Sequence, residues 1–216
     1  MKQVLIVGLG RFGKHVAMKL NEFGHQVMAV DTTEERVQEV LPYVTNGQIG
    51  DATNAEFLKS LGITNFDVCV VAIGDDFQSS LEATSLLKEL GAKFVVARAS
   101  RNVQRKFLLR NGADEVVYPE HQMADWTAVR YTVDHILDYI SINSEYGIIE
   151  IAMPPQWVGK TVVELDIRKK HNGNIVAVKD NGRINMEIRP DTKFEAGQTV
   201  LILGNIQRLQ KVFGSN

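Results

Sequence analysis

Short apolar runs alternate with longer helical patterns along the first 119 residues of the chain. Apolar runs rich in β-branched residues lie at 4–7, 27–30, 68–73 and 94–97, with weaker runs at 48–49 and 116–118. The stretches between them predict helices at 12–23, 33–41, 54–61, 77–90 and 102–111. Short, continuously apolar strands separated by helices are typical of a parallel sheet covered on both faces. Six such strands predict an α/β fold with a Rossmann-like doubly wound parallel sheet.

A different pattern follows between residues 120 and 143. Residues 120–140 predict one or two helices, on which apolar side chains recur at helical spacing. These side chains are Trp126, Val129, Val133, Ile136 or Leu137, and Ile140. Because the stripe comes after the sixth strand has completed the sheet, we expect it to pack against a second subunit. Packing on the parent domain is the alternative.

A second, smaller α+β domain is predicted from residue 144 onward. Its strands are expected at 148–153, 174–179, 183–188 and 199–203, and its helices at 161–170 and 205–213. Asp180-Asn181-Gly182 is typical of a hairpin turn. The sequence thus predicts a first domain at 1–119, a crossover helix and linker at 120–143, and a second domain at 144–216. A domain as small as the second is expected to be stabilised by pairing with a copy.

Composition narrows the possible classes of function. The formal net charge of -2 provides no basic field, which argues against a nucleic-acid partner. Cys69 is the sole cysteine, and its place in an apolar run predicts a buried core residue. The sequence has no run of about 18 apolar residues that could cross a bilayer, and its first apolar run is too short for a signal peptide. We therefore expect a soluble, cytoplasmic protein.

The first apolar run leads directly into Gly8-Leu9-Gly10-Arg11-Phe12-Gly13. In such a motif Gly8 makes the tight turn, Gly10 lets the backbone approach a pyrophosphate, and Gly13 lets the helix pack on the strand. The helix then offers free N–H groups and its positive dipole end to a phosphate. Asp31 ends the second strand at close to the spacing expected for a ligand of the ribose hydroxyls. The motif predicts an adenine nucleotide site, with the glycines of an ordinary turn as the alternative.

Asp31 also bears on which nucleotide binds. A carboxylate at this position repels a 2′-phosphate, which disfavours NADP. NAD, NADH, ADP and ATP all remain open as ligands. Thr32, which directly follows Asp31, is assigned to the same site.

Two further turns lie at the carboxyl edge of the predicted sheet. Gly50-Asp51-Ala52-Thr53 is expected to contact the adenine or its ribose; in the alternative interpretation, Asp51 or Thr53 is the N-cap of the next helix. Ile73-Gly74-Asp75-Asp76 has either a phosphate-side role or a simple capping role. Arg11 and Arg98 are candidate ligands of a terminal phosphate. Otherwise they are solvated arginines that cover neighbouring elements.

The residue patterns that enzymes of this fold use for chemistry are missing from the sequence. The five histidines form no pair, and no Tyr-x-x-x-Lys pattern, P-loop, Gly-x-Ser-x-Gly turn or zinc motif is present. We therefore predict a nucleotide sensor without catalytic residues. An NAD-dependent oxidoreductase with a small substrate domain is the alternative, although no residue stands out to manage the proton. A transcription factor would need a basic helix-turn-helix, whereas 205–213 carries only Arg208 and Lys211 as cations.

Together these motifs resemble the RCK (KTN) family of regulators of potassium conductance, in particular the cytoplasmic gating subunits of Ktr/Trk-type potassium uptake systems. Residues 1–140 resemble the N-terminal RCK (TrkA-N) domain with its crossover helix, and residues 144–216 resemble the C-terminal RCK (TrkA-C) domain. The second match depends on the order of elements and on Phe194-Glu-Ala-Gly197. The first is carried by Val7–Gly13, Val30-Asp31, Gly50–Thr53, Val71–Gly74, Ala97–Ala99, Gly112–Asp114 and Tyr118–Glu120.

The resemblance implies homodimers joined through the crossover helix and assembled into an octameric ring. Such a ring docks on an integral-membrane potassium channel or transporter at the inner face of the cell membrane, and changes shape with bound ATP or ADP, or NAD or NADH. Arg11 matches the family arginine that reaches a terminal phosphate across the dimer. Glu120 matches an acid near those phosphates, where it would hold Mg²⁺ or Ca²⁺; an ordinary acid of the first helical turn is the alternative.

In some relatives the C-terminal domain binds cyclic di-AMP at its dimer interface. The resemblance places Arg168, Lys169, Asn174 and Pro190 in that region, with a solvated basic helix end as the alternative. The predicted metal ligand is Glu120. The complete set of predicted nucleotide-binding residues is Gly8, Gly10, Arg11, Phe12, Gly13, Asp31, Thr32, Asp51, Ala52, Thr53, Ile73, Gly74, Arg98 and Glu120.

Overall fold

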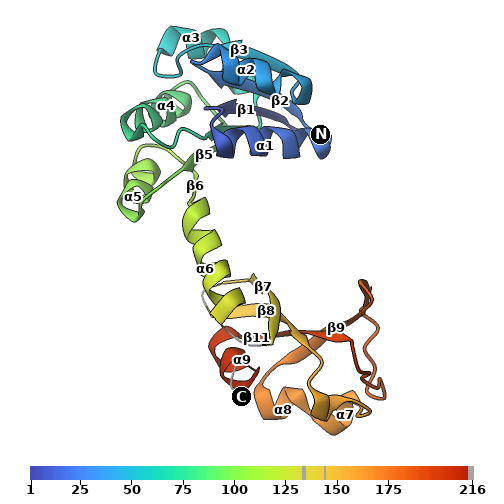
Figure 1. Ribbon diagram of the computed structural model, residues 1–216. Coiled ribbons are helices and arrows are strands. Elements are labelled where there is room, and N and C mark those ends of the chain that lie inside the picture. Colours follow the sequence, from blue (N-terminus) through green and yellow to red (C-terminus); the bar gives the residue numbers. More distant parts are fainter. Residues whose placement is uncertain (133–134, 144, 214–216) are drawn as a thin grey trace. The chain divides into compact units, whose positions relative to one another are not determined.

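A computed structural model describes residues 1–132, 135–143 and 145–213. The chain divides into two compact units, residues 1–121 and 122–216 (Figure 1). No helix among the described residues is long and apolar enough to cross a membrane. Each unit has its own sheet and its own apolar core.

The first unit contains a six-stranded sheet in which every pairing is parallel. The strand order β3-β2-β1-β4-β5-β6 places β1 between β2 and β4, where the order of strands along the chain reverses. Ligands of doubly wound sheets bind at the carboxyl ends of the strands beside such a reversal. The parallel pairings and this strand order confirm the predicted α/β fold with a Rossmann-like doubly wound sheet. The strands are β1 (Gln3–Val7), β2 (Gln26–Asp31), β3 (Asn46–Ile49), β4 (Val68–Val71), β5 (Val95–Arg98) and β6 (Glu115–Val117).

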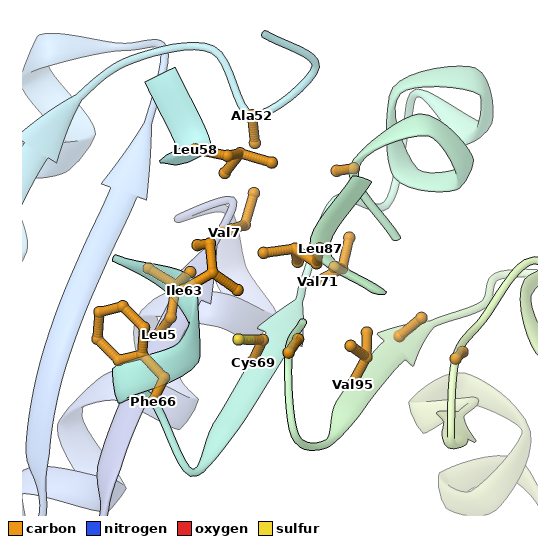
Figure 2. Packing of buried hydrophobic residues seen from close by; sticks show 14 of the residues in the cluster. Leu5, Val7, Ala52, Leu58, Ile63, Phe66, Cys69, Val71, Leu87 and Val95 are labelled. Carbon is orange, nitrogen blue, oxygen red and sulfur yellow. The ribbon is translucent and has the colours of Figure 1, made fainter. Parts of the chain in front are cut away.

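Helices cover both faces of this sheet because successive side chains of a strand point to opposite sides. On β1, Ile6 is buried in a cluster with residues of α1 and α2, while Leu5 and Val7 are buried in a cluster with residues of α3, α4 and α5 (Figure 2). The helices are α1 (Arg11–Glu22), α2 (Glu34–Val40), α3 (Ala55–Ser60), α4 (Phe77–Glu89) and α5 (Asn102–Arg110), with short 3₁₀ turns η1 (Leu41–Tyr43) and η2 (Ile63–Asn65).

Cys69 lies in the second of these clusters and is fully buried (Figure 2). Burial raises the pKa of its thiol to about 12, and the Lys88 charge acts in the opposite direction. Cys69 is therefore a neutral, apolar core residue, as its place in the sequence predicts.

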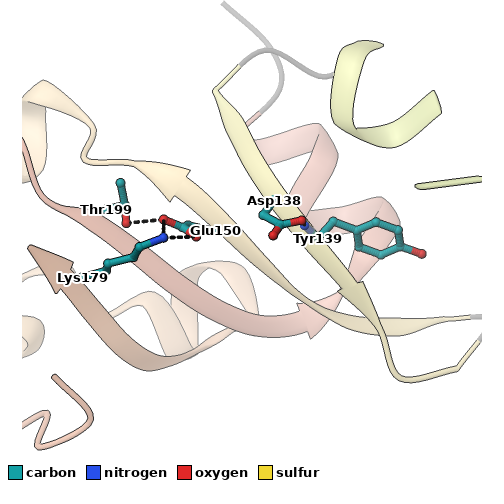
Figure 3. Close-up of polar contacts among 5 residues, drawn as sticks. All are labelled: Asp138, Tyr139, Glu150, Lys179 and Thr199. Atoms are coloured by element: carbon teal, nitrogen blue, oxygen red, sulfur yellow. Dashed lines mark hydrogen bonds and ion pairs between the residues drawn. The ribbon is translucent and has the colours of Figure 1, made fainter. Parts of the chain in front are cut away.

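The second unit is built on a five-stranded antiparallel sheet of order β10-β9-β11-β8-β7. Ile149 and Ile151 of β8 are buried in its core with Phe194. Glu150, between them, points to the other face, where it accepts hydrogen bonds from Thr199 Oγ1 at 2.6 Å and Lys179 Nζ at 3.2 Å (Figure 3). The elements are β7 (Ile136–Ser141), β8 (Tyr146–Ala152), β9 (Asn174–Asp180), β10 (Arg183–Asn185), β11 (Thr199–Asn205), η3 (Pro155–Trp157), α7 (Val162–Leu165), α8 (Ile167–His171) and α9 (Ile206–Phe213).

The predicted helical character of residues 136–140 is wrong. The helix α6 runs from Pro119 to Thr132, and residues 136–141 form β7, an edge strand paired with β8. His135, at φ 67°, has a left-handed backbone that no right-handed helix can continue. Of the predicted apolar stripe, α6 keeps Trp126 and Val129, Ile136 and Ile140 belong to β7, and Val133 lies outside the described residues.

Two smaller predictions in the second unit also need correction. The helix expected at 161–170 is two short helices, α7 and α8, because Asp166 between them has a left-handed φ of 47°. The strand expected at 183–188 ends at Asn185.

Candidate nucleotide-binding site

A cavity of about 750 Å³ lies in the first unit, beyond the carboxyl ends of β1, β2, β4 and β5. We refer to it as the glycine-loop cavity. All the predicted nucleotide-binding residues except Gly13 line it, although they come from six separate segments of the chain. These lining residues are Gly8, Gly10, Arg11, Phe12, Asp31, Thr32, Asp51, Ala52, Thr53, Ile73, Gly74, Arg98 and Glu120.

The three glycines at the junction of β1 and α1 are required for different reasons. Gly8 has a left-handed φ of 91°, and its N–H donates to the Val30 carbonyl at 2.8 Å. A Cβ on Gly13 would lie 1.9 Å from the Gly8 carbonyl oxygen, so Gly13 permits α1 to pack against the turn. A Cβ on Gly10 would meet no atom within 4 Å. Because Gly10 lines the cavity, its missing side chain leaves that space for a ligand.

The N-terminus of α1 begins at this loop. Gly10 is its N-cap and supplies no capping side chain, and the first turn contains no acid. The N–H groups of a first helical turn have no partner within their helix, and the helix dipole makes this end positive. The end of α1 at the cavity therefore offers N–H donors to an anion such as a pyrophosphate.

Asp31 is held in place by the backbone around it. Its Oδ2 accepts the Leu9 N–H at 2.7 Å, and its Oδ1 accepts the Thr33 N–H at 2.9 Å. The side chain is only 5% exposed, so the carboxylate is fixed against the glycine loop. Arg36 Nη1 lies 3.5 Å from Asp31 Oδ2 and also lines the cavity. Arg36 was not among the site residues predicted from the sequence. The signal that could have identified it is its position, as a cation in the first turn of α2, the helix that follows Asp31.

The turn after β3 is ordered by Asp51. Asp51 Oδ1 accepts hydrogen bonds from both the N–H and the hydroxyl of Thr53, each at 2.8 Å. The N-cap of α3 is Asn54, which accepts from Glu56 and Phe57 N–H groups. The alternative in which Asp51 or Thr53 caps this helix is therefore wrong.

The turn after β4 divides its residues between two roles. Asp76 is the N-cap of α4: its carboxylate accepts from the Ser79 hydroxyl at 2.6 Å and the Ser79 N–H at 3.1 Å, which lowers the pKa of Asp76. Ile73 and Gly74 line the cavity, as do Asp75 and Asp76. Capping is thus the observed role of Asp76, while Gly74 makes room for a neighbouring side chain. A Cβ on Gly74 would lie 1.9 Å from Arg98 Nη1.

Arg98 connects three parts of the cavity. Its guanidinium lies beside Gly74, its Cζ is 5.8 Å from the centre of the Phe12 ring, and its Nη2 donates to Glu120 Oε1. Burial by itself raises the pKa of Glu120. Hydrogen bonds from its own backbone N–H and from Arg98, with the charges of Arg98 and Arg11, lower the pKa below its ordinary value. Arg11 is exposed and lines the same cavity.

His15 also lines the cavity, which sequence reasoning did not anticipate. It lies one helical turn after Arg11, and its Nδ1 donates to the Arg11 carbonyl at 2.6 Å. Within residues 1–132, 135–143 and 145–213, no group of three or more His, Cys, Asp or Glu is arranged to hold a metal ion.

A second cavity of about 330 Å³ lies in the second unit, beside α7, α8 and the start of β9. Of the four residues that the resemblance places at a cyclic di-AMP site, Arg168, Asn174 and Pro190 line this cavity. Lys169 does not, whereas Arg189 does.

Comparisons with known proteins identify the family. Residues 4–119 match the TrkA-N domain and residues 147–214 match the TrkA-C domain. The chain is 34% identical over 210 residues to Ktr system potassium uptake protein C of Bacillus subtilis (strain 168), covering 97% of this chain and 95% of that protein. The chain belongs to the TrkA-type (RCK) family of potassium uptake proteins. Ktr system potassium uptake protein A of Vibrio alginolyticus is 30% identical over 208 residues, covering 96% of this chain and 94% of that one.

Solved structures of the family share the fold. The GsuK channel bound to NAD superposes with a TM-score of 0.71 at 18% identity, covering 100% of this chain. This chain spans only 40% of the GsuK chain. At this identity the likeness establishes only that the fold of this chain corresponds to that part of the GsuK chain.

Proposed function

We propose that this chain is a nucleotide-sensing regulatory subunit that gates a membrane potassium channel or transporter from the cytoplasmic side, and that it is not an enzyme. The glycine-loop cavity carries the proposal, because it combines a helix N-terminus, a fixed acid and arginines in one place. The names of its relatives, potassium uptake proteins of Ktr systems, supply the process that the nucleotide would control.

Each end of the cavity suits one part of an adenine nucleotide. The Asp31 carboxylate, at the end of β2, would accept hydrogen bonds from the ribose hydroxyls. The first-turn N–H groups of α1 would donate to the pyrophosphate. Arg11 and Arg98 would then contact a terminal phosphate, in this subunit or in its neighbour.

Gating requires no hydrolysis in this scheme. A ligand shifts an equilibrium between two shapes only by the difference between its affinities for them. Contacts of Arg11 and Arg98 with a terminal phosphate would provide that difference between ATP and ADP. NAD and NADH lack a terminal phosphate and would have to act through the adenosine and pyrophosphate contacts alone.

The assembly and location that we propose follow the family. A homodimer joined through α6 and ordered into an octameric ring would place several nucleotide sites beneath one pore subunit. The protein would then lie at the inner face of the membrane through that partner. The exposed surface of α6 supports a role in pairing, since Met123 is 56% exposed and Tyr131 is 73% exposed.

A divalent cation is a further proposed ligand. Glu120 is the only predicted metal ligand, and one carboxylate is fewer ligands than Mg²⁺ or Ca²⁺ needs. Mg²⁺ commonly binds through one or two carboxylates completed by phosphate oxygens and water. Glu120 lines the same cavity as the phosphate-binding elements, so its carboxylate and a nucleotide phosphate would hold the ion together.

A second-messenger site in the second unit is proposed on the cavity that Arg168, Asn174 and Pro190 line. Cyclic di-AMP consists of two equivalent nucleotide halves. Two copies related by a twofold axis would present two such cavities, one for each half.

The test is a set of separate titrations with ATP, ADP, NAD and NADH, with and without Mg²⁺, combined with potassium flux through the reconstituted transporter. We expect Asp31→Ala to weaken every ribose nucleotide by about tenfold or more, since it removes a charged acceptor and the anchor of the glycine loop. We expect Arg11→Ala to weaken ATP more than ADP.

Two results would contradict the proposal. Equal affinities and equal flux for ATP and ADP, together with no effect of NAD or NADH, would leave the cavity without a sensing role. Turnover of NADH with a small carbonyl compound would instead favour an NAD-dependent oxidoreductase.

A further inference from the structure

Glu120 and Arg98 form an ion pair inside the glycine-loop cavity, and the two partners differ in how firmly they are held. The Arg98 side chain is 18% exposed, whereas the Glu120 side chain is 56% exposed. Arg98 lies between the Phe12 ring and Gly74, where only a glycine leaves room for its Nη1. Glu120, by contrast, contributes one oxygen from the first turn of α6. Packing therefore fixes the position of Arg98, whereas the exposed Glu120 carboxylate can be replaced by another anion.

The Glu120 carboxylate of this pair lies where a bound phosphate would also place negative charge. Phe12, against which Arg98 packs, belongs to the first turn of α1, the anion-binding end of that helix. The Arg11 charge also acts on Glu120 and contributes to lowering its pKa. Glu120 is thus a carboxylate in the field of two arginines, beside the helix end that would bind the pyrophosphate.

The pairing with Glu120 does not satisfy every donor of Arg98. Arg98 Nε is buried and has no hydrogen-bond partner among the described residues. Buried polar groups are normally paired, so an arrangement that leaves one donor unpaired is open to replacement by a better one. A phosphate presents three oxygens to a guanidinium and binds it in a bidentate manner, which a single carboxylate oxygen does not.

We propose that Glu120 and the terminal phosphate of a bound nucleotide compete for Arg98, so that Glu120 is a specificity-determining residue of the site. This inference rests on the proposed nucleotide-binding function and adds a residue-level account of selectivity. A nucleotide whose phosphate chain reaches Arg98 displaces Glu120 and must overcome that pairing. A shorter nucleotide leaves the ion pair intact and binds through the glycine loop and Asp31 alone.

The competition also has a structural consequence. Glu120 is in the first turn of α6, and α6 continues beyond His121 into the second unit. Displacement of Glu120 therefore changes a side-chain contact on the segment of chain that joins the two units. ATP would break this contact and ADP would keep it, which gives the two nucleotides different effects on the same helix.

The experiment measures ATP and ADP affinities of the full chain by titration calorimetry in EDTA, so that no divalent cation contributes. We expect Glu120→Gln to strengthen ATP binding by about two- to fivefold, the range typical of a partly exposed ion pair, and to leave ADP unchanged. Glu115→Gln is the matched control. It removes the same charge from exposed Glu115 of β6, which does not line the cavity, and should change neither affinity.

A double-mutant cycle separates competition from simple repulsion between Glu120 and the phosphate. If Glu120 acts by holding Arg98, Glu120→Gln has no effect on ATP affinity in an Arg98→Gln background. Repulsion would persist in that background, and such persistence would overturn the proposal. Should Arg98→Gln fail to fold, Gly74→Ala takes its place, because its Cβ would lie 1.9 Å from Arg98 Nη1 and force the guanidinium to move.

The wild-type protein distinguishes failure of this inference from failure of the proposed function. If it binds neither ATP nor ADP, both are wrong. If it binds both nucleotides and Glu120→Gln changes ATP affinity no more than Glu115→Gln does, the competition alone is refuted and the sensing role stands.

Discussion

Replacement of Gly10 by alanine tests the nucleotide site with little disturbance of the fold. Gly10 has φ -62° and ψ -175°, an extended conformation that alanine adopts freely. Apart from its neighbours in the chain, the added methyl group would meet no atom within 4 Å, and Gly10 lines the glycine-loop cavity. The substitution therefore acts on whatever approaches this backbone.

Two small and opposite effects on stability are expected. Alanine is a poorer N-cap than glycine, which costs about 0.5–1 kcal/mol. Alanine also restricts the unfolded chain more than glycine does, which stabilises the fold by about 0.4–1 kcal/mol. The free energy of unfolding should consequently stay within about 0.5 kcal/mol of the wild-type value.

The expected effect on binding is much larger. A methyl group at Gly10 prevents a pyrophosphate from reaching the first-turn N–H groups of α1. Loss of one hydrogen bond to a charged group costs about 1.5–3 kcal/mol, which corresponds to roughly a tenfold to 150-fold weaker affinity. Calorimetric titration with ADP measures this loss, and urea unfolding measures stability in parallel.

Gly13→Ala is the companion variant with the opposite expectation. Its Cβ would lie 1.9 Å from the Gly8 carbonyl oxygen, so the turn or the helix must move, at a cost of about 1–3 kcal/mol in stability. If Gly10→Ala binds ADP as tightly as the wild type, a nucleotide does not use this loop. If Gly10→Ala destabilises the fold as much as Gly13→Ala, our assignment of separate roles to the two glycines is wrong.

Two further predictions concern other parts of the chain. Asp114 accepts from Lys88 Nζ and from the Val95 N–H, both at 2.7 Å. Burial alone would raise the pKa of Asp114, but these hydrogen bonds and the Lys88 charge lower it below its ordinary value. Ionised Asp114 thus contributes stability that is fully present above the unfolded-state pKa of about 3.9. That contribution is lost as the pH falls through the lower folded-state pKa. We expect Asp114→Asn to cost about 1 kcal/mol at neutral pH, with the difference from wild type narrowing in urea unfolding toward about pH 3; a pH-independent difference would contradict this. In the second unit, Arg168→Ala should abolish binding of cyclic di-AMP by the full chain while the exposed Lys169→Ala leaves it unchanged, and equal effects of the two would refute the site.

Local sequence patterns were sufficient to predict the first sheet and most of the residues that line the glycine-loop cavity at its edge. Six apolar runs predict six strands because strands buried on both faces need continuous apolar sequence. Gly8, Gly10 and Asp31 could be assigned from spacing alone, since the chain geometry of a strand–turn–helix unit places them at one edge of the sheet. The turn residues that follow β3 and β4 could be predicted to lie at this edge for the same reason.

Segments of ambiguous periodicity were decided by tertiary pairing. Residues 136–140 satisfy a helical spacing as well as a strand, and a run this short cannot be assigned from periodicity. A right-handed helix cannot continue through the left-handed backbone at His135, and residues 136–141 form a strand by pairing with β8. The break at Asp166 is likewise a backbone conformation that the run 161–170 does not reveal.

The sequence by itself thus predicted the doubly wound sheet, the glycine loop, Asp31 and the buried Cys69, because the patterns that indicate them each lie within a short segment of the chain. Only the tertiary structure showed that Arg36 lies against Asp31, that His15 lines the cavity, and that Arg98 is paired with Glu120. The contacts of both arginines join residues on different elements, and whether two side chains meet there depends on how strand ends and helices pack. No spacing along the chain encodes that packing directly, so the contacts between the glycine-loop cavity and α6 could be seen only in the folded chain.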